Sequence, residues 1–135
     1  MNAASGSRRV ATVAVVVAGY DEAIAWYTGR LGFTLASDVD LGEGKRWVTV
    51  SPTAGNGAQL LLAEAKDEAE RSRIGDQTGG RVFLFLETDD FLRDHAAMLA
   101  RGVEFREAPR VEPYGTVAVF ADLYGNLWDL IQPKR

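Results

Sequence analysis

The chain has 135 residues, 47% hydrophobic and 25% charged, which is typical of one globular domain and not of a disordered segment. Its net charge of −4 comes without a concentrated basic patch, and this argues against a nucleic-acid or anionic-membrane partner. Cysteine is absent and His95 is the single histidine, so disulfides, thiolate nucleophiles and metal sites of two or three histidines from one chain are excluded.

The N-terminal segment predicts a leader followed by a core strand. Arg8 and Arg9 precede an apolar run at 10–18, a pattern that resembles a short signal sequence. The run is too short to span a bilayer, which requires about 20 apolar residues, and it matches a second strand later in the chain. We therefore expect residues 1–8 to be a flexible leader and the protein to be cytoplasmic.

The first half of the chain predicts one helix among four strands. β-Branched and apolar residues recur with strand periodicity, and glycine-rich turns at 42–45 and 52–57 separate the later strands. The predicted elements are a strand at 10–17, a helix at 21–30, and strands beginning at 33, 46 and 58.

The second half repeats this order. Gly32 and Gly102, which each close a predicted helix, lie 70 residues apart, and residues 66–80 between the halves predict a linker with a helical turn. The sequence therefore predicts an α+β fold of two tandem β-α-β-β-β modules, at 9–65 and 81–133. The repeated elements are a strand at 81–87, a helix at 90–101, and strands beginning at 103, 116 and 127.

A duplicated module of this kind predicts a ligand site. A helix covers only one face of each sheet, so we expect two sheets side by side to curve into a trough lined by their other faces. On the helices, apolar periodicity predicts the inward side chains. They are Ile24, Tyr27 and Leu31 in the first helix, and Phe91, Ala96 and Leu99 in the second.

Three segments resemble a known family. They are Gly-Tyr-Asp-Glu-Ala-Ile-Ala-Trp-Tyr at 19–27, Leu-Gly-Phe at 31–33 and Asp-Leu-Tyr-Gly-Asn-Leu-Trp-Asp-Leu at 122–130. The chain is similar to the glyoxalase, bleomycin-resistance and extradiol-dioxygenase superfamily, also called vicinal oxygen chelate proteins. The resemblance implies a homodimer with a cupped site to which both chains contribute.

The same resemblance bears on metal binding. Metal-dependent members of that family carry ligands at positions that correspond here to Thr12, Leu61, Phe83 and Asp129. One carboxylate cannot hold a transition metal that needs three or four protein ligands, so we expect no metal cofactor. A hard cation such as Mg²⁺, completed by substrate oxygens, is the alternative.

The side chains expected in the trough favour a flat or apolar organic ligand. Asp129 and Glu87 are the candidate acid–base groups. Trp47 faces the trough in one strand register and Arg46 in the other. Trp128 alternates with Asp129 and is expected in the core, and His95 is expected to be an ordinary helix residue. The candidate ligand-binding residues are Thr12, Ala14, Trp47, Leu61, Phe83, Phe85, Tyr114 and Asp129.

Three functions compete on this basis. The leading hypothesis is a metal-free protein that binds a natural product or antibiotic and gives resistance by sequestration. The second is a metal-independent isomerase or lyase in which Asp129 or Glu87 is the general base. The third is a metal-dependent dioxygenase or lyase. A purely structural dimer module is a fourth reading.

Overall fold

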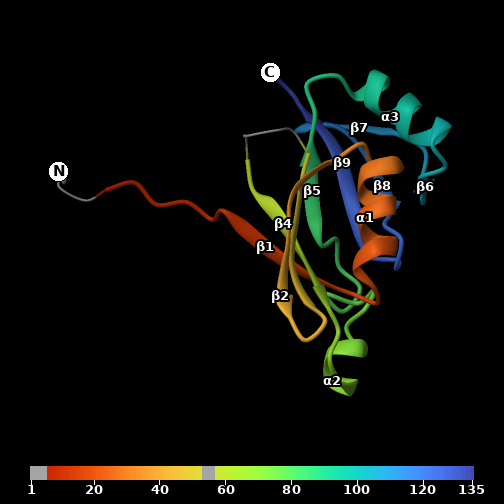
Figure 1. Ribbon diagram of the computed structural model, residues 1–135. Helices are drawn as coiled ribbons and strands as arrows, with labels where there is room; N and C mark the ends of the chain where they lie inside the picture. The colour runs from red at the N-terminus through yellow and green to blue at the C-terminus, as the bar shows by residue number, and fades with distance from the viewer. Residues whose placement is uncertain (1–5, 53–56) are drawn as a thin grey trace.

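Two mixed β-sheets form the body of the protein, which we describe from a computed structural model for residues 6–52 and 57–135. Figure 1 shows the first sheet to the left and the second to the right, with α3 at one end and α2 at the other. Residues 53–56, part of the predicted turn at 52–57, and residues 1–5 of the predicted leader lie outside the described residues.

The first sheet has the strand order β1-β4-β3-β2. Its outer strand β1 runs parallel to β4, the last strand of the module, while the other pairs are antiparallel. Alternation sorts its side chains: Val15 and Val17 are fully buried, whereas Thr12 and Ala14 are exposed. The strands are β1 (Thr12–Val17), β2 (Thr34–Gly42), β3 (Lys45–Ser51) and β4 (Gln59–Glu64).

The second sheet repeats this plan in the order β5-β9-β8-β6, with β5 parallel to β9. A fifth strand, β7, also pairs with β8, because the strand predicted from residue 103 is split in two. Between the pieces the side chain of Glu107, not a backbone carbonyl, accepts a hydrogen bond from the backbone of Val119. The strands are β5 (Leu84–Glu87), β6 (Glu104–Phe105), β7 (Arg110–Glu112), β8 (Gly115–Ala121) and β9 (Leu127–Pro133).

Three helices connect the strands of the described residues: α1 (Tyr20–Gly29), α2 (Glu68–Arg71) and α3 (Phe91–Ala100). The α+β fold class is confirmed, and the short α2 lies in the predicted linker. The inward face predicted for α3 is confirmed at Phe91, which is buried, and wrong at Ala96 and Leu99, which are exposed. Met98 is buried in their place. Met98 follows Phe91 by about two helical turns, so both side chains lie on the same face of α3. Among residues 6–52 and 57–135, no helix has the length and apolar composition needed to cross a membrane.

One hydrophobic core joins both modules. The ring of Tyr27 on α1 lies 5.8 Å from that of Phe33 and 6.1 Å from that of Trp128, between centroids, so α1 contacts both sheets. We call the face of each sheet that packs into this core its covered face, and the opposite face its open face. The two sheets therefore meet through their covered faces, and their open faces point away from each other. This corrects the expectation that the open faces line one trough within a chain.

The turn at 122–126 in the second module is hydrogen-bonded to α1 of the first module. The Tyr27 hydroxyl donates to the Asp122 carboxylate at 2.7 Å, and that carboxylate also accepts from the side chain of Asn126 at 2.9 Å. Burial, and then the charge of Asp122, raise the pKa of Tyr27 well above its usual value, so the hydroxyl stays protonated and donates. The most specific segment of the family resemblance thus includes a structural joint.

The C-terminal ends of α1 and α3 also contact each other across the two modules. A Cβ added at Gly32 would lie 2.7 Å from a guanidinium nitrogen of Arg101, and one added at Gly102 would lie 2.7 Å from that of Arg30. Each arginine therefore reaches across to the glycine that closes the other module's helix. Both glycines have positive φ values, +77° and +87°, which side-chain-bearing residues rarely adopt.

Candidate functional site

The first-sheet open face is an apolar surface. Its centre is the pair Ala14 and Leu61, which lie opposite each other on β1 and β4, and a short hydroxyl contact of 2.6 Å joins Ser37 and Thr49 beside it. The residues that alternation and register assign to this face are Thr12, Ala14, Val16, Trp47, Thr49, Leu61 and Ala63.

The structure settles the register of β3. Trp47 is 44% exposed on this open face, whereas Arg46 lies on the covered side with its guanidinium 5.0 Å above the ring of Tyr20. Arg46 also pairs with Asp21 at 3.0 Å and with Asp38 at 2.8 Å, so it is held at the N-terminus of α1 and away from the open face. This pairing lowers the pKa of Asp38.

A cleft of about 570 Å³ lies at the edge of the first-sheet open face. Trp47, Leu61 and Ala63 contribute apolar lining, and Lys66 and Glu70 contribute charge at the rim. The volume is in the usual range of small-molecule sites, about 300–1,000 Å³.

The second-sheet open face is centred on Asp129 of β9. Asp129 lies between Phe85 of β5 and Val119 of β8 in the ladder. Phe85 is 65% exposed, so an aromatic ring stands free beside the carboxyl group. Further residues that register assigns to this face are Glu87, Arg110, Val117 and Ile131.

The carboxyl group of Asp129 is buried on this face without a full set of hydrogen-bond partners in the described part of the chain. It is only 8% exposed, and its Oδ1 atom is buried without a hydrogen-bond partner among the described residues. Burial raises the pKa of Asp129, an effect that the nearby Arg110 opposes and Glu107 reinforces. A buried acceptor of this kind favours a ligand that brings a donor.

Arg110 and Glu107 were not predicted as site residues. The Arg110 guanidinium donates to Glu107 at 3.0 Å, to Glu112, and to the Tyr114 hydroxyl at 3.3 Å. These hydrogen bonds raise the pKa of Arg110 and hold its charge in place. Arg110 and Glu112 are two residues apart on one strand, and this spacing of opposite charges on one face could have indicated their pairing. Nothing in the sequence indicated the turn that brings Glu107 to the same place.

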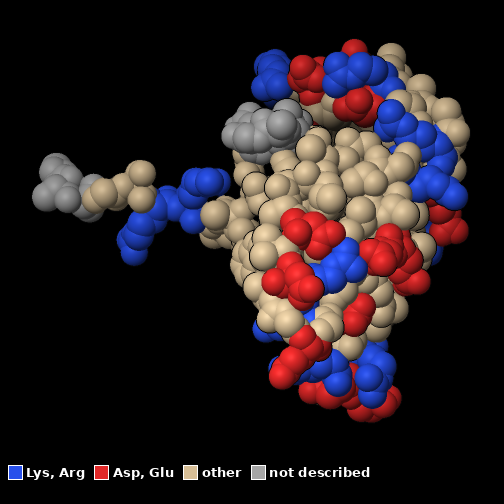
Figure 2. Space-filling model, in the orientation of Figure 1, with Lys and Arg blue, Asp and Glu red and all other residues tan. Residues whose placement is uncertain are grey.

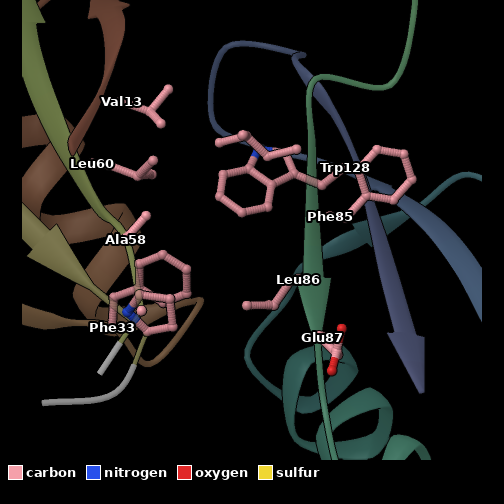
Figure 3. Close-up of a pocket in the computed structure, with 11 residues that line it drawn as sticks. Val13, Phe33, Ala58, Leu60, Phe85, Leu86, Glu87 and Trp128 are labelled. Carbon is pink, nitrogen blue, oxygen red and sulfur yellow. The ribbon is translucent and has the colours of Figure 1, made fainter. Parts of the chain in front are cut away.

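A second cleft, of about 430 Å³, lies between the two sheets on their covered sides. Figure 3 shows Val13 and Leu60 on one wall and Trp128 and Leu86 on the other, while Phe85 points the opposite way. This cleft is lined mostly by apolar side chains.

Phe83 is not on the open face as predicted. Its ring packs edge-on against Trp128, with centroids 6.5 Å apart, and joins the core. The reason is that β5 begins at Leu84, so strand alternation does not extend to Phe83. Trp128 itself is 3% exposed and lies in the core as predicted.

The remaining predicted residues have simple placements. Glu87 ends β5 and is exposed, and Tyr114 is 53% exposed at the turn before β8. His95 packs between the rings of Phe91 and Phe105, at centroid distances of 5.4 and 4.5 Å. His95 therefore serves the packing of α3 and faces neither cleft.

The positions that correspond to metal ligands hold Thr12, Leu61, Phe83 and Asp129, which together offer one carboxylate. Within residues 6–52 and 57–135, no three or more His, Cys, Asp or Glu side chains are grouped so that they could hold a metal ion. The donor set therefore does not fit a transition metal bound by three or four protein ligands.

Comparison with known proteins identifies the family. Residues 9–130 match the sequence model of the Glyoxalase/Bleomycin resistance protein/Dioxygenase superfamily. An uncharacterized protein of Shewanella frigidimarina is 54% identical over 121 residues, which cover 89% of this chain and 90% of that protein.

Solved structures agree. UcmS2 superposes with a TM-score of 0.80 at 29% identity, over 93% of this chain and 98% of that one. TnmS3, an antibiotic binding protein from Streptomyces sp. CB03234, has a TM-score of 0.76 at 30% identity, over 96% of this chain and 99% of that one. The chain therefore belongs to the glyoxalase/bleomycin resistance protein/dioxygenase superfamily.

Proposed function

We propose that this protein binds an aromatic or apolar small molecule, such as an antibiotic or other natural product, without a transition-metal cofactor and without chemical change. Its biological effect is then resistance by sequestration. The similarity to TnmS3, an antibiotic binding protein, supports this proposal.

The observation that carries the proposal is that the positions corresponding to metal ligands in metal-dependent members of the family hold other residue types here. Leu61 and Thr12 offer no strong ligand, and Asp129 is the single carboxylate of the set. The same open faces instead present the rings of Trp47 and Phe85, which give large contact areas to a flat ligand.

The two open faces of one chain point apart, so the proposed trough needs a second copy. We propose a homodimer in which the first-sheet open face of one chain opposes the second-sheet open face of its partner. The ligand then lies between Trp47 of one chain and Phe85 of the other. A closed two-fold dimer of this kind contains two equal sites.

Native mass spectrometry with a panel of aromatic antibiotics tests the binding function. We expect a complex with one member, recovery of that molecule unchanged, and no stoichiometric metal in protein purified without chelator. Phe85→Ser should weaken the complex, whereas the matched Leu92→Ser, which removes another exposed apolar residue on α3, should not. Turnover of the ligand contradicts sequestration.

Mixing two defective variants tests the shared trough. Trp47→Ser and Phe85→Ser chains should each bind weakly, but random pairing leaves about one quarter of the troughs with both native walls. Wild-type affinity should therefore return in that fraction. A mixture that binds no better than either variant alone would contradict the shared trough.

A metal-independent isomerase or lyase is the second candidate, and the raised pKa of Asp129 favours it. A buried carboxyl with a raised pKa is a stronger base once ionised. If a panel member is converted, Asp129→Asn should abolish conversion while binding persists. Conversion that survives this substitution excludes Asp129 as the base.

Figure 2 adds an observation on partners. On the face shown, acidic and basic side chains are interspersed at both ends, where α3 and α2 lie, and also on the surface between them. That face therefore offers no extended basic surface to a polyanion.

A further inference from the structure

We infer that the ligand carries a positively charged amine beside its aromatic body, and that Asp129 recognises this amine. The inference rests on the proposed binding function, because it assigns the ligand class of the same site. It concerns the second-sheet open face, where the carboxyl groups outnumber the cations that neutralise them.

The first step is the buried carboxylate oxygen of Asp129, which lacks a hydrogen-bond donor within the part of the chain that the structure describes. Asp129 is more than nine-tenths buried, and its Oδ1 has no partner among the described residues. Leaving such an acceptor unpaired is costly, and a carboxylate is the most costly case. Its strand neighbours Phe85 and Val119 are apolar and donate nothing from their side chains.

The second step is that the one nearby cation is already engaged. Arg110 pairs with Glu107 and with Glu112, so two carboxylates share its single charge before Asp129 is considered. No ion pair within 4.0 Å joins Arg110 to Asp129 among residues 6–52 and 57–135. With Asp129 ionised, this group of four side chains carries an excess of two negative charges.

The third step is the exposed ring beside the acid. Phe85 lies directly opposite Asp129 in the β5–β9 ladder and is 65% exposed. An ammonium group above an aromatic face gains a cation–π interaction, and at a carboxylate it gains a charge-assisted hydrogen bond. A neutral aromatic alcohol can satisfy the hydrogen bond but not the excess negative charge.

A pair of matched probes tests the inference: 2-naphthylmethylamine, which is cationic at neutral pH, and its neutral isostere 2-naphthylmethanol. Both are titrated into the ¹⁵N-labelled full chain at low salt. We expect the amine to bind about tenfold or more tightly than the alcohol, because a charge-assisted hydrogen bond is stronger than a neutral one. Added salt should reduce this preference.

Asp129→Asn should remove the preference for the amine and leave the affinity for the alcohol nearly unchanged. The melting temperature of this variant should equal or exceed that of the wild type, since a buried carboxylate is lost. Asp40→Asn, on the far part of β2, is the matched control and should retain the preference.

The outcomes separate the two proposals. Equal affinity for both probes, or a preference that survives Asp129→Asn, overturns the amine inference but leaves the binding function standing. If neither probe binds the wild type, both proposals are overturned.

Discussion

The pairs Ala14–Leu61 and Phe85–Asp129 occupy equivalent places in the two modules. Each joins the first strand to the last strand of its sheet in the same parallel register, and each lies on an open face. One pair is entirely aliphatic, whereas the other combines an exposed ring with a buried acid. The two modules therefore share their strand plan but present different chemistry to a ligand.

The covered faces do not differ in this way. Val15–Leu62 in the first sheet and Leu86–Leu130 in the second are both apolar pairs packed into one core. A covered face must exclude water and pack against a helix, which restricts the residue types that it can hold. An open face has no such restriction, so the two modules can differ there, and we propose the open faces as the binding surfaces.

Adjacent residues on β9 give the largest test of this comparison. Trp128→Ala on the covered side should lower the free energy of unfolding by about 3–5 kcal/mol, because it leaves a large cavity where four aromatic rings meet. Asp129→Asn should cost nothing measurable. Urea denaturation of both variants measures the contrast, and equal losses would contradict the division between the faces.

The reciprocal glycines test whether the modules are joined symmetrically. Gly32→Ala and Gly102→Ala should each lower the free energy of unfolding by about 1–2 kcal/mol, since both positions have positive φ and a guanidinium at 2.7 Å. The control is Gly29→Ala in α1, where an added Cβ meets nothing within 4 Å. It should be neutral or stabilise by up to about 1 kcal/mol. Unequal effects at Gly32 and Gly102 would count against a symmetric joint.

Alkaline pH should weaken the joint between the modules. The pKa of Tyr27 is raised in the folded state, while an unfolded tyrosine releases its proton near pH 10. The contribution of Tyr27 is therefore complete below about pH 10. It is lost as the pH rises further, at up to about 1.4 kcal/mol for each pH unit.

Urea midpoints at pH 9, 10 and 11 measure this loss. Tyr124, whose pKa burial raises to about 12, adds to the slope. Tyr27→Phe is the control and should give a shallower decline above pH 10. An unchanged slope in this variant would show that Tyr27 does not cause the loss.

Replacing Trp47 should have little effect on stability. It is 44% exposed and its replacement by serine leaves the core intact, so the free energy of unfolding should change by no more than about 0.5 kcal/mol. Ligand affinity should nevertheless fall about tenfold, because a stacking surface is lost. A large loss of stability would place Trp47 in the core and not in a binding face.

The fold was predictable because its signals are local and repeated. Periodicity, the two helix-closing glycines and the linker predicted both modules, and alternation placed Trp128 and Asp129 on opposite faces. The arrangement of the sheets was not predictable, because it depends on the contact between Tyr27 of the first module and Trp128 of the second. A sequence pattern shows which face of a strand is covered but not which other sheet lies there.

The candidate site was predicted only in part. Asp129, Phe85 and Leu61 lie on open faces, as alternation indicates, whereas the strand register that decides between Trp47 and Arg46 was left open by the sequence. Glu107 and the split between β6 and β7 were missed, because a side chain that replaces a backbone partner leaves no periodic signal.

The indole N–H signals of the three tryptophans offer the most direct test of the central claim, that the open faces bind the ligand and the covered faces hold the fold. A ¹⁵N spectrum of the full chain is recorded during titration with the antibiotic that forms the complex, and Trp→Phe variants assign the signals. The account predicts that the Trp47 signal moves with ligand while the Trp128 signal does not. Movement of Trp128 with Trp47 unchanged would place the ligand in the cleft between the sheets and contradict the account.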